Sequence, residues 1–262
     1  MAAIAYGVRF GVRVSEPGAL PPLLERLPPA WRLSSSQAVD RLYSLVIGGA
    51  GARRGVQRLN LLYAGAALIA RTENTEEASE RFESDVRLYV AERAPRRVFV
   101  HAGVVGWGGQ AILIPGRSLS GKTTLVAELV RAGARYYSDE YAVLDAEGRV
   151  HPYARPLAVR EGEDLKQTRR RVEEFGGRAG TRPLEVGSII VSRYERGRRW
   201  NPRRLSPGEG VLEMLSNTVS ARRSPRRVLA ALTNAAKRAT TLAGPRGEAV
   251  SAAASILKSL ET

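Results

Sequence analysis

Cysteine is absent from the sequence, and histidine occurs only twice. Without thiols the chain cannot form a disulfide bond, a thiolate zinc site or a cysteine nucleophile. Long hydrophobic runs are also missing, because the longest one, around residues 61–70, is far too short to span a bilayer. The amino-terminal residues lack the basic start, apolar core and small-residue cleavage site of a signal peptide. We therefore expect a soluble, cytoplasmic protein with no membrane partner.

Lysine is scarce, since only four of the 41 basic residues are lysines and the others are arginines. The formal net charge is +15, and residues 166–238 carry +12 of it, with 18 basic and six acidic residues. One interpretation is a surface that attracts an anionic partner, such as a nucleotide or an acidic peptide. The alternative is a solvated arginine-rich face. Few aromatic residues lie among these arginines and no nucleic-acid-binding motif is present, so a nucleic-acid partner is not expected.

The chain is long enough, at 262 residues, for a small domain plus a medium one. Its pattern changes near residue 96, so we expect a small α+β domain at 1–96 and an α/β nucleotide-binding core with a basic helical C-terminal part at 97–262. In the first domain we expect strands at 5–14 and 41–48, a hairpin formed by 57–63 and 66–71, and a helix that starts at Asn74, with Glu77 as its capping-box partner, and ends at Pro95.

The second domain should alternate strands and helices. Its first two strands, VFVHAGVVGW and QAILIPG, flank a tight Gly108–Gly109 turn, and a glycine loop and a helix follow. The next strand, 134–145, is expected to bend at an acidic pair. Further elements are expected as helices at 163–175, 207–217, 225–239 and 248–260, and as an apolar strand at 186–193.

The stretch PGRSLSGKTTL has the glycine, four-residue gap and Gly-Lys-Thr of a P-loop, and it stands between an expected strand and an expected helix. Backbone N–H groups at the start of such a helix surround the β-phosphate of a nucleotide. Lys122 would bridge the β- and γ-phosphates, Thr123 would bind Mg²⁺, and Thr124 would reach the α-phosphate. The expected nucleotide-binding residues are Gly116, Arg117, Ser118, Leu119, Ser120, Gly121, Lys122, Thr123 and Thr124.

Two further features flank this loop. Asp139 and Glu140 follow the helix by about fifteen residues, and such acids can hold Mg²⁺ and accept a proton from an attacking hydroxyl. They can divide these tasks only where the strand end is irregular, because adjacent residues of a regular strand face opposite ways. A solvated acidic turn is the alternative. His101, on the strand before the loop, could bond a phosphate or a carboxylate, or it could be a structural histidine.

These features in this order resemble the catalytic core of bacterial HPr kinase/phosphorylase and its relatives, over residues 101–140. The resemblance implies a P-loop core of the HPr kinase and phosphoenolpyruvate carboxykinase type that uses ATP and Mg²⁺. It implies that Asp139 is the general base toward a serine hydroxyl, that Glu140 is associated with Mg²⁺, and that His101 lies near the phosphates. The family usually has glycine where this chain has Leu119, so we expect that leucine to adopt a negative φ and to turn its side chain away from the phosphates.

The chain also departs from that family. The glycine-rich second signature, which the family uses for the reverse reaction, is not found, and residues 1–96 do not resemble the family's N-terminal domain. We therefore expect a kinase that acts on a serine of a peptide or protein other than HPr, one that is acidic if the basic segment binds it. The alternatives are a kinase for a small molecule such as free serine, a non-catalytic ATP-binding regulator, and a carboxykinase-like enzyme. A homo-oligomer stays open.

Arginines after the acid pair are the remaining candidates for the site. Arg155 and Arg160, in PYARPLAVR, could reach the γ-phosphate or an anionic substrate. Arg117, inside the loop, could do the same. The alternative for each is a surface arginine in an arginine-rich protein.

Overall fold

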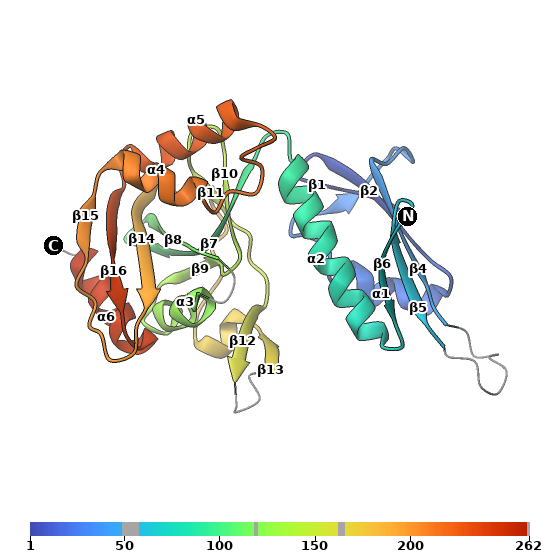
Figure 1. The fold of residues 1–262 in the computed structure, drawn as a ribbon, viewed down its shortest axis with the longest axis horizontal. Coiled ribbons are helices and arrows are strands. Elements are labelled where there is room, and N and C mark those ends of the chain that lie inside the picture. Colours follow the sequence, from blue (N-terminus) through green and yellow to red (C-terminus); the bar gives the residue numbers. More distant parts are fainter. Residues whose placement is uncertain (49–57, 118–119, 162–165, 261–262) are drawn as a thin grey trace. The chain divides into compact units, whose positions relative to one another are not determined.

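The computed structural model describes residues 1–48, 58–117, 120–161 and 166–260, and the side chains of all of these except 160, 161, 166 and 167. The chain divides into two compact units, Met1–Arg96 and Arg97–Thr262. Both are mixed α/β structures, and each is described by itself (Figure 1). None of the helices in the described residues combines the length and the apolar character that crossing a membrane requires.

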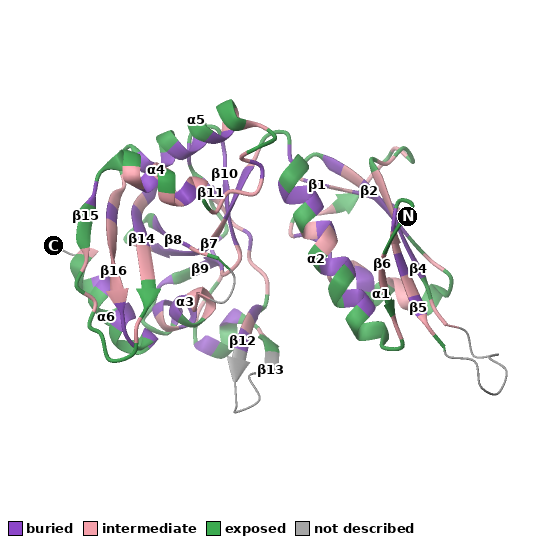
Figure 2. Ribbon diagram, viewed as in Figure 1, coloured by how far each residue is buried: buried purple, intermediate pink, exposed green. Residues whose placement is uncertain are grey.

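The first unit is a six-stranded sheet in the order β3-β1-β2-β4-β5-β6, with α2 packed against β5 and β6. Phe82, Val86 and Val90 of α2 are fully buried, which confirms the apolar helix face expected from their spacing (Figure 2). The elements are β1 Ala2–Ala5, β2 Val8–Val14, the 3-10 turn Pro17–Ala19, α1 Leu20–Leu24, β3 Arg32–Leu33, β4 Arg41–Val46, β5 Asn60–Ala64, β6 Ala67–Thr72 and α2 Thr75–Arg93.

Two expectations for this unit were wrong in detail. The strand expected at 5–14 is confirmed over β2, Val8–Val14, but it begins later, because Tyr6 and Gly7 both adopt positive φ and reverse the chain between β1 and β2. Asn74 does cap α2, accepting a hydrogen bond from the Glu76 amide at 2.8 Å. Glu77, however, accepts a bond from the Thr72 hydroxyl rather than completing a capping box with Asn74.

The second unit is an eight-stranded sheet between two helical layers. The strand order is β11-β10-β7-β8-β14-β16-β15, and β9 pairs with β7. In Figure 1, α3 and α6 lie on one face of the sheet and α4 and α5 on the other. The elements are β7 Val98–Trp107, β8 Gln110–Pro115, α3 Lys122–Arg131, β9 Arg135–Ser138, β10 Tyr141–Leu144, β11 Val150–His151, β14 Val186–Tyr194, β15 Arg203–Leu205, α4 Pro207–Leu215, α5 Pro225–Ala236, β16 Thr240–Arg246 and α6 Ala249–Leu260.

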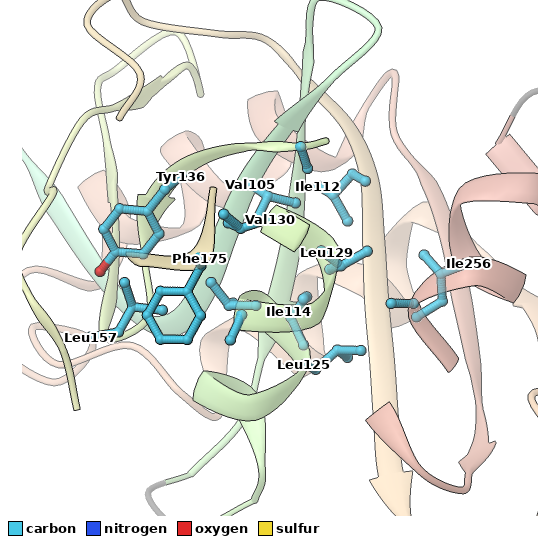
Figure 3. Packing of buried hydrophobic residues seen from close by; sticks show 14 of the residues in the cluster. Val105, Ile112, Ile114, Leu125, Leu129, Val130, Tyr136, Leu157, Phe175 and Ile256 are labelled. Atoms are coloured by element: carbon cyan, nitrogen blue, oxygen red, sulfur yellow. The ribbon is translucent and has the colours of Figure 1, made fainter. Parts of the chain in front are cut away.

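Alternation along β8 explains why this sheet has a core on each side. Ile112 and Ile114 face the cluster under α3 and α6, whereas Ala111 and Leu113 face the cluster under α4 and α5. Figure 3 shows the first cluster. In it, Ile114 and the leucines of α3 lie with Phe175 on one side and Ile256 of α6 on the other. This packing holds α3, and with it the loop that precedes α3, against the sheet.

The expected helix at 163–175 was wrong over residues 166–175; its first three residues lie outside the described residues. Residues Leu157–Glu161 (β12) and Lys166–Arg170 (β13) form a two-stranded antiparallel sheet, and a 3-10 turn, Val172–Phe175, follows. The charged sequence of this segment has good intrinsic helix propensity, but propensity is a weak prior. The buried side chains of Leu157 and Val159 belong to the core beneath α3, so tertiary packing favours an extended conformation.

The strand β16 was not expected. Its sequence, TTLAGPR, contains glycine and proline, which are depleted in strands, so no strand signal was visible. It nevertheless pairs in parallel with β14 along its whole length and antiparallel with β15. The expected strand at 186–193 and the helices at 207–217, 225–239 and 248–260 are confirmed, with ends shifted by up to three residues.

Candidate nucleotide-binding site

Three parallel strands end at one edge of the second sheet. β14 pairs in parallel with β8 and with β16, so Pro115, Tyr194 and Arg246 finish their strands on the same side. The edge formed by the carboxyl ends of parallel strands is where open α/β sheets bind ligands. The loop that carries the Gly-Lys-Thr motif leaves β8 at this edge.

The loop runs from β8 into the first turn of α3. Gly116 donates its amide to the carbonyl of His101 at 3.1 Å, and a Cβ at Gly116 would lie 2.9 Å from the Ser120 hydroxyl. Gly121 caps α3 with φ 78°, a left-handed conformation that favours glycine. Arg117 is exposed. Ser118 and Leu119 lie outside the described residues, so the prediction about Leu119 stays a prediction.

Lys122 is directed into this loop. Its ammonium donates to the carbonyl oxygen of Arg117 at 2.5 Å, five residues back. Burial lowers the pKa of Lys122, and the nearby carboxylates of Asp139 and Glu140 counter that effect in part. A half-buried ammonium at the N-terminus of a helix can hold phosphate oxygens.

The acid pair occupies a break between two strands. β9 ends at Ser138 and β10 begins at Tyr141, so the expected bend is confirmed. The Ser138 hydroxyl oxygen accepts the amides of Glu140 and Tyr141, at 3.0 and 2.9 Å, and so closes a tight turn. The backbone at Asp139 and Glu140 is therefore irregular, and the two carboxylates bond different partners.

Asp139 faces the start of α3. Its Oδ2 accepts hydrogen bonds from the Thr123 hydroxyl at 3.0 Å and from the Ala158 amide at 3.3 Å, and its Oδ1 accepts one from the Tyr136 hydroxyl at 2.9 Å. Burial first, and then the charge and hydrogen bond of Asp139, raise the pKa of Tyr136, so its hydroxyl remains a donor at neutral pH. Hydrogen-bond donors from α3, β9 and Leu157–Glu161 hold this carboxylate beside Thr123.

Glu140 bonds an arginine instead. Its Oε2 accepts a hydrogen bond from Nη1 of Arg155 at 3.0 Å, and both side chains are largely shielded from solvent. Arg155, one of the two arginines expected near the γ-phosphate, is therefore attached to the acid pair. The side chain of Arg160, the other, lies outside the described residues.

His101 lies on β7, directly opposite Tyr141 of β10, and the two rings are 4.6 Å apart. Burial and the positive charge of Lys122 lower the pKa of His101. The imidazole is therefore neutral at pH 7. The structure thus groups His101, Lys122, Thr123, Asp139 and Glu140 around one end of the loop.

Arg246 is a site residue that the sequence analysis missed. It ends β16, is only 3% exposed, and donates through Nη2 to the carbonyl oxygens of Gly121 at 3.0 Å and Ser120 at 3.5 Å. It lies 125 positions along the chain from Gly121. No sequence signal marked it, since β16 itself was not recognised and arginine is abundant throughout.

The oxygen donors near the loop suit magnesium. Among the described residues there is no group of three or more His, Asp or Glu side chains that could hold a metal ion. Mg²⁺ in nucleotide enzymes is held by one or two protein oxygens together with phosphate oxygens and water. Thr123 and Asp139, with Glu140 beside them, provide such oxygens, so these residues fit Mg²⁺ bound with a nucleotide.

No protein-family model and no curated protein matches this chain.

Proposed function

We propose that this chain is an ATP- and Mg²⁺-dependent kinase that transfers the γ-phosphate to a serine hydroxyl of a peptide or protein. In this proposal residues 97–262 form a P-loop core of the HPr kinase and phosphoenolpyruvate carboxykinase type. The observation that supports it most strongly is the 3.0 Å hydrogen bond from Thr123 to Asp139. This bond joins the position of the motif that binds Mg²⁺ to the acid pair that phosphoryl transfer requires.

The triphosphate would bind along the loop and the start of α3. Amides at the helix N-terminus, together with the Lys122 ammonium, are donors for the phosphate oxygens. Mg²⁺, when bound, would neutralise charge on the β- and γ-phosphates. Thr123 would hold Mg²⁺, with Glu140 beside it, and Asp139 would orient the Thr123 hydroxyl. Arg155, bonded to Glu140, would neutralise charge near the γ-phosphate.

The transfer itself is a displacement at phosphorus. The acceptor oxygen forms a bond to the γ-phosphorus, the bond to the oxygen that bridges the β- and γ-phosphates breaks, and ADP leaves with that electron pair. Asp139 accepts the proton of the acceptor hydroxyl as the new bond forms. The Lys122 ammonium would stabilise negative charge on the transferring group, and the N–H of neutral His101 could donate a hydrogen bond at the phosphate end.

Mixing the protein with ATP, Mg²⁺ and serine peptides tests this proposal, with ADP release and the mass of the phosphopeptide as readouts. Asp139→Asn should reduce phosphotransfer by about 100-fold or more while nucleotide binding survives, because general-base catalysis contributes about 10²–10⁴-fold. The exposed Glu147→Gln on another turn is the matched control and should change neither.

The other possible results of this experiment distinguish the kinase from the alternative functions. Wild-type protein that binds MgATP but phosphorylates only free serine would be a small-molecule kinase. ATP binding without transfer to any acceptor would support a regulatory protein. A protein that binds no nucleotide in the presence of Mg²⁺ would overturn the proposal, and an Asp139→Asn variant with full activity would remove Asp139 from the role of base.

A further inference from the structure

A cavity of about 450 Å³ opens beside the loop, on the side away from the acid pair. It lies at the carboxyl ends of β14 and β16, where Ser192 and Tyr194 from β14, Arg246 from β16, and Glu248 border it together with Ser120 and Thr124. Its volume is in the range of pockets that hold small organic ligands. The phosphate chemistry described above does not use it.

Two adjacent threonines, Thr123 and Thr124, indicate in which direction a bound nucleotide would extend. Thr123 bonds Asp139, whereas Thr124, one position on and about 100° further around the helix, lines the cavity. A triphosphate whose metal-bound end lies at Thr123 therefore has its other end, the α-phosphate, on the side of Thr124. The group attached to the α-phosphate of a nucleotide is the nucleoside.

Tyr194 is the aromatic side chain at the mouth of this cavity. It is 47% exposed, which is unusual for a large aromatic residue, yet it is held in place by a 2.7 Å hydrogen bond from its hydroxyl to Oε1 of Glu248. The guanidinium carbon of Arg246 lies 5.7 Å from the centre of its ring. An exposed ring whose orientation is fixed by a neighbour is suited to stacking on a nucleobase.

Arg246 closes the inner wall of the cavity. Its Nη2 bonds the loop carbonyls and its Nη1 bonds the Gly247 carbonyl, but its buried Nε has no acceptor among the residues that the structure describes. The guanidinium therefore stays buried against the loop as a fixed cation at the edge of the cavity. The cavity thus joins a stacking surface, a cation and the N-terminal end of α3.

We propose that this cavity binds the base and ribose of the nucleotide, with Tyr194 stacked on the base, while the triphosphate lies along the loop. This inference rests on the proposed function, since it concerns the other half of the same ligand. The cavity around Tyr194 would then determine which nucleoside binds, because the loop motif contacts phosphates only.

Binding of ATP and of inorganic tripolyphosphate, each with Mg²⁺, separates the two halves of the site. Tyr194→Ala should weaken ATP binding about tenfold or more, because stacking of one base on an aromatic ring contributes roughly that much. It should leave tripolyphosphate binding unchanged, since this probe has no nucleoside. Tyr194→Phe keeps the ring but loses the bond to Glu248, so it should weaken ATP binding less than Tyr194→Ala does.

A second variant changes Ser192, the residue of β14 that lines the cavity. Ser192→Phe places a large side chain in the cavity and should weaken ATP binding but not tripolyphosphate binding, even if Tyr194→Ala proves poorly folded. Equal affinity of both variants and wild type for ATP would overturn this inference and leave the kinase proposal standing. Equal loss for both probes would also overturn it. Wild-type protein that binds neither probe would overturn the proposed function, and this inference with it.

Discussion

Arg246 shows how one side chain can set the geometry of a loop that it follows by more than a hundred residues. It bonds the carbonyl oxygens of Ser120 and Gly121, and the N–H groups of the same two peptide units belong to Gly121 and Lys122. In a trans peptide the C=O and N–H point in opposite directions. Holding both oxygens on the Arg246 side therefore turns both N–H groups away from Arg246, toward the side where the proposed function places the phosphates.

We expect Arg246→Met to weaken binding of ATP and of tripolyphosphate alike, by about tenfold or more, because a hydrogen bond from a charged donor contributes about 1.5–3 kcal/mol. Methionine fills a similar volume but leaves the carbonyl oxygens of Ser120 and Gly121 without this donor. The free energy of unfolding should therefore fall as well, by about 1–3 kcal/mol. Isothermal titration and urea denaturation measure the two effects. Arg204→Met, at an exposed position of β15, is the control and should alter neither.

His101 gives a prediction about pH. Its pKa is lowered in the folded protein, so between the folded and the unfolded pKa the unfolded chain binds the proton and the folded chain does not. The stabilisation by neutral His101 is therefore complete above the unfolded pKa, near 6.5, and is lost as the pH falls toward the folded pKa. Between pH 7.5 and 5.5, urea denaturation should show a smaller loss of stability for His101→Gln than for wild type. Parallel curves for the two proteins would contradict the prediction.

At the scale of elements, the loop requires glycine at position 121, where a Cβ atom would clash with a neighbouring side chain. Gly121 combines a φ of 78° with a position at which a Cβ would lie 2.6 Å from Nη2 of Arg246. Gly109, in the β7–β8 turn, has a φ of 80° and no atom within 4 Å of such a Cβ. The two glycines therefore share a backbone conformation and differ only in what surrounds them.

Alanine at these two positions should separate backbone strain from contact. Gly109→Ala should cost about 1–2 kcal/mol of stability, the usual penalty for a left-handed residue, and should leave ATP affinity unchanged. Gly121→Ala should cost more and should weaken ATP binding strongly, because it displaces the guanidinium of Arg246. Urea denaturation and titration with MgATP measure both. Equal effects of the two substitutions would mean that the contact with Arg246 is unimportant.

Among elements, the sequence predicted best where a local pattern agreed with tertiary packing. The strand, loop and helix around Lys122 and the break at Asp139–Glu140 were predicted from neighbouring residues and are confirmed as local structure. The segment 163–175 was predicted wrongly because its helix propensity is local, whereas the burial of Leu157 and Val159 that favours strands is not. β16 was missed because its pairing with β14 lies outside its own sequence.

At the scale of the whole molecule, charge is the dominant feature. Most of the net charge of +15 comes from residues 166–238. Of the arginines in that segment, Arg193, Arg198 and Arg203 bond acidic neighbours but remain largely exposed. Exposed ion pairs contribute little to stability, so the excess charge acts mainly on molecules that approach the surface.

We expect this charge to favour acidic acceptors. With two serine peptides of equal length, one flanked by aspartates and one by lysines, kcat/KM should be higher for the acidic peptide at low salt. The ratio should fall toward one between about 0.05 and 0.5 M salt, because the Debye length shrinks over that range. Rates of phosphopeptide formation measure it. A ratio that does not depend on salt would show that the arginine-rich segment is a solvated face with no part in recognition.

The sequence by itself determined which residues could carry phosphate chemistry. The Gly-Lys-Thr motif, the acid pair and His101 are local patterns, and their chemistry follows from residue type and spacing. Only the tertiary structure decided which groups meet. It joined Asp139 to Thr123 and Glu140 to Arg155, and it brought Arg246 to the loop. The physical reason is that these contacts depend on strand pairing and core packing between segments far apart in the chain, and such long-range contacts leave no periodic signal in the residues that make them.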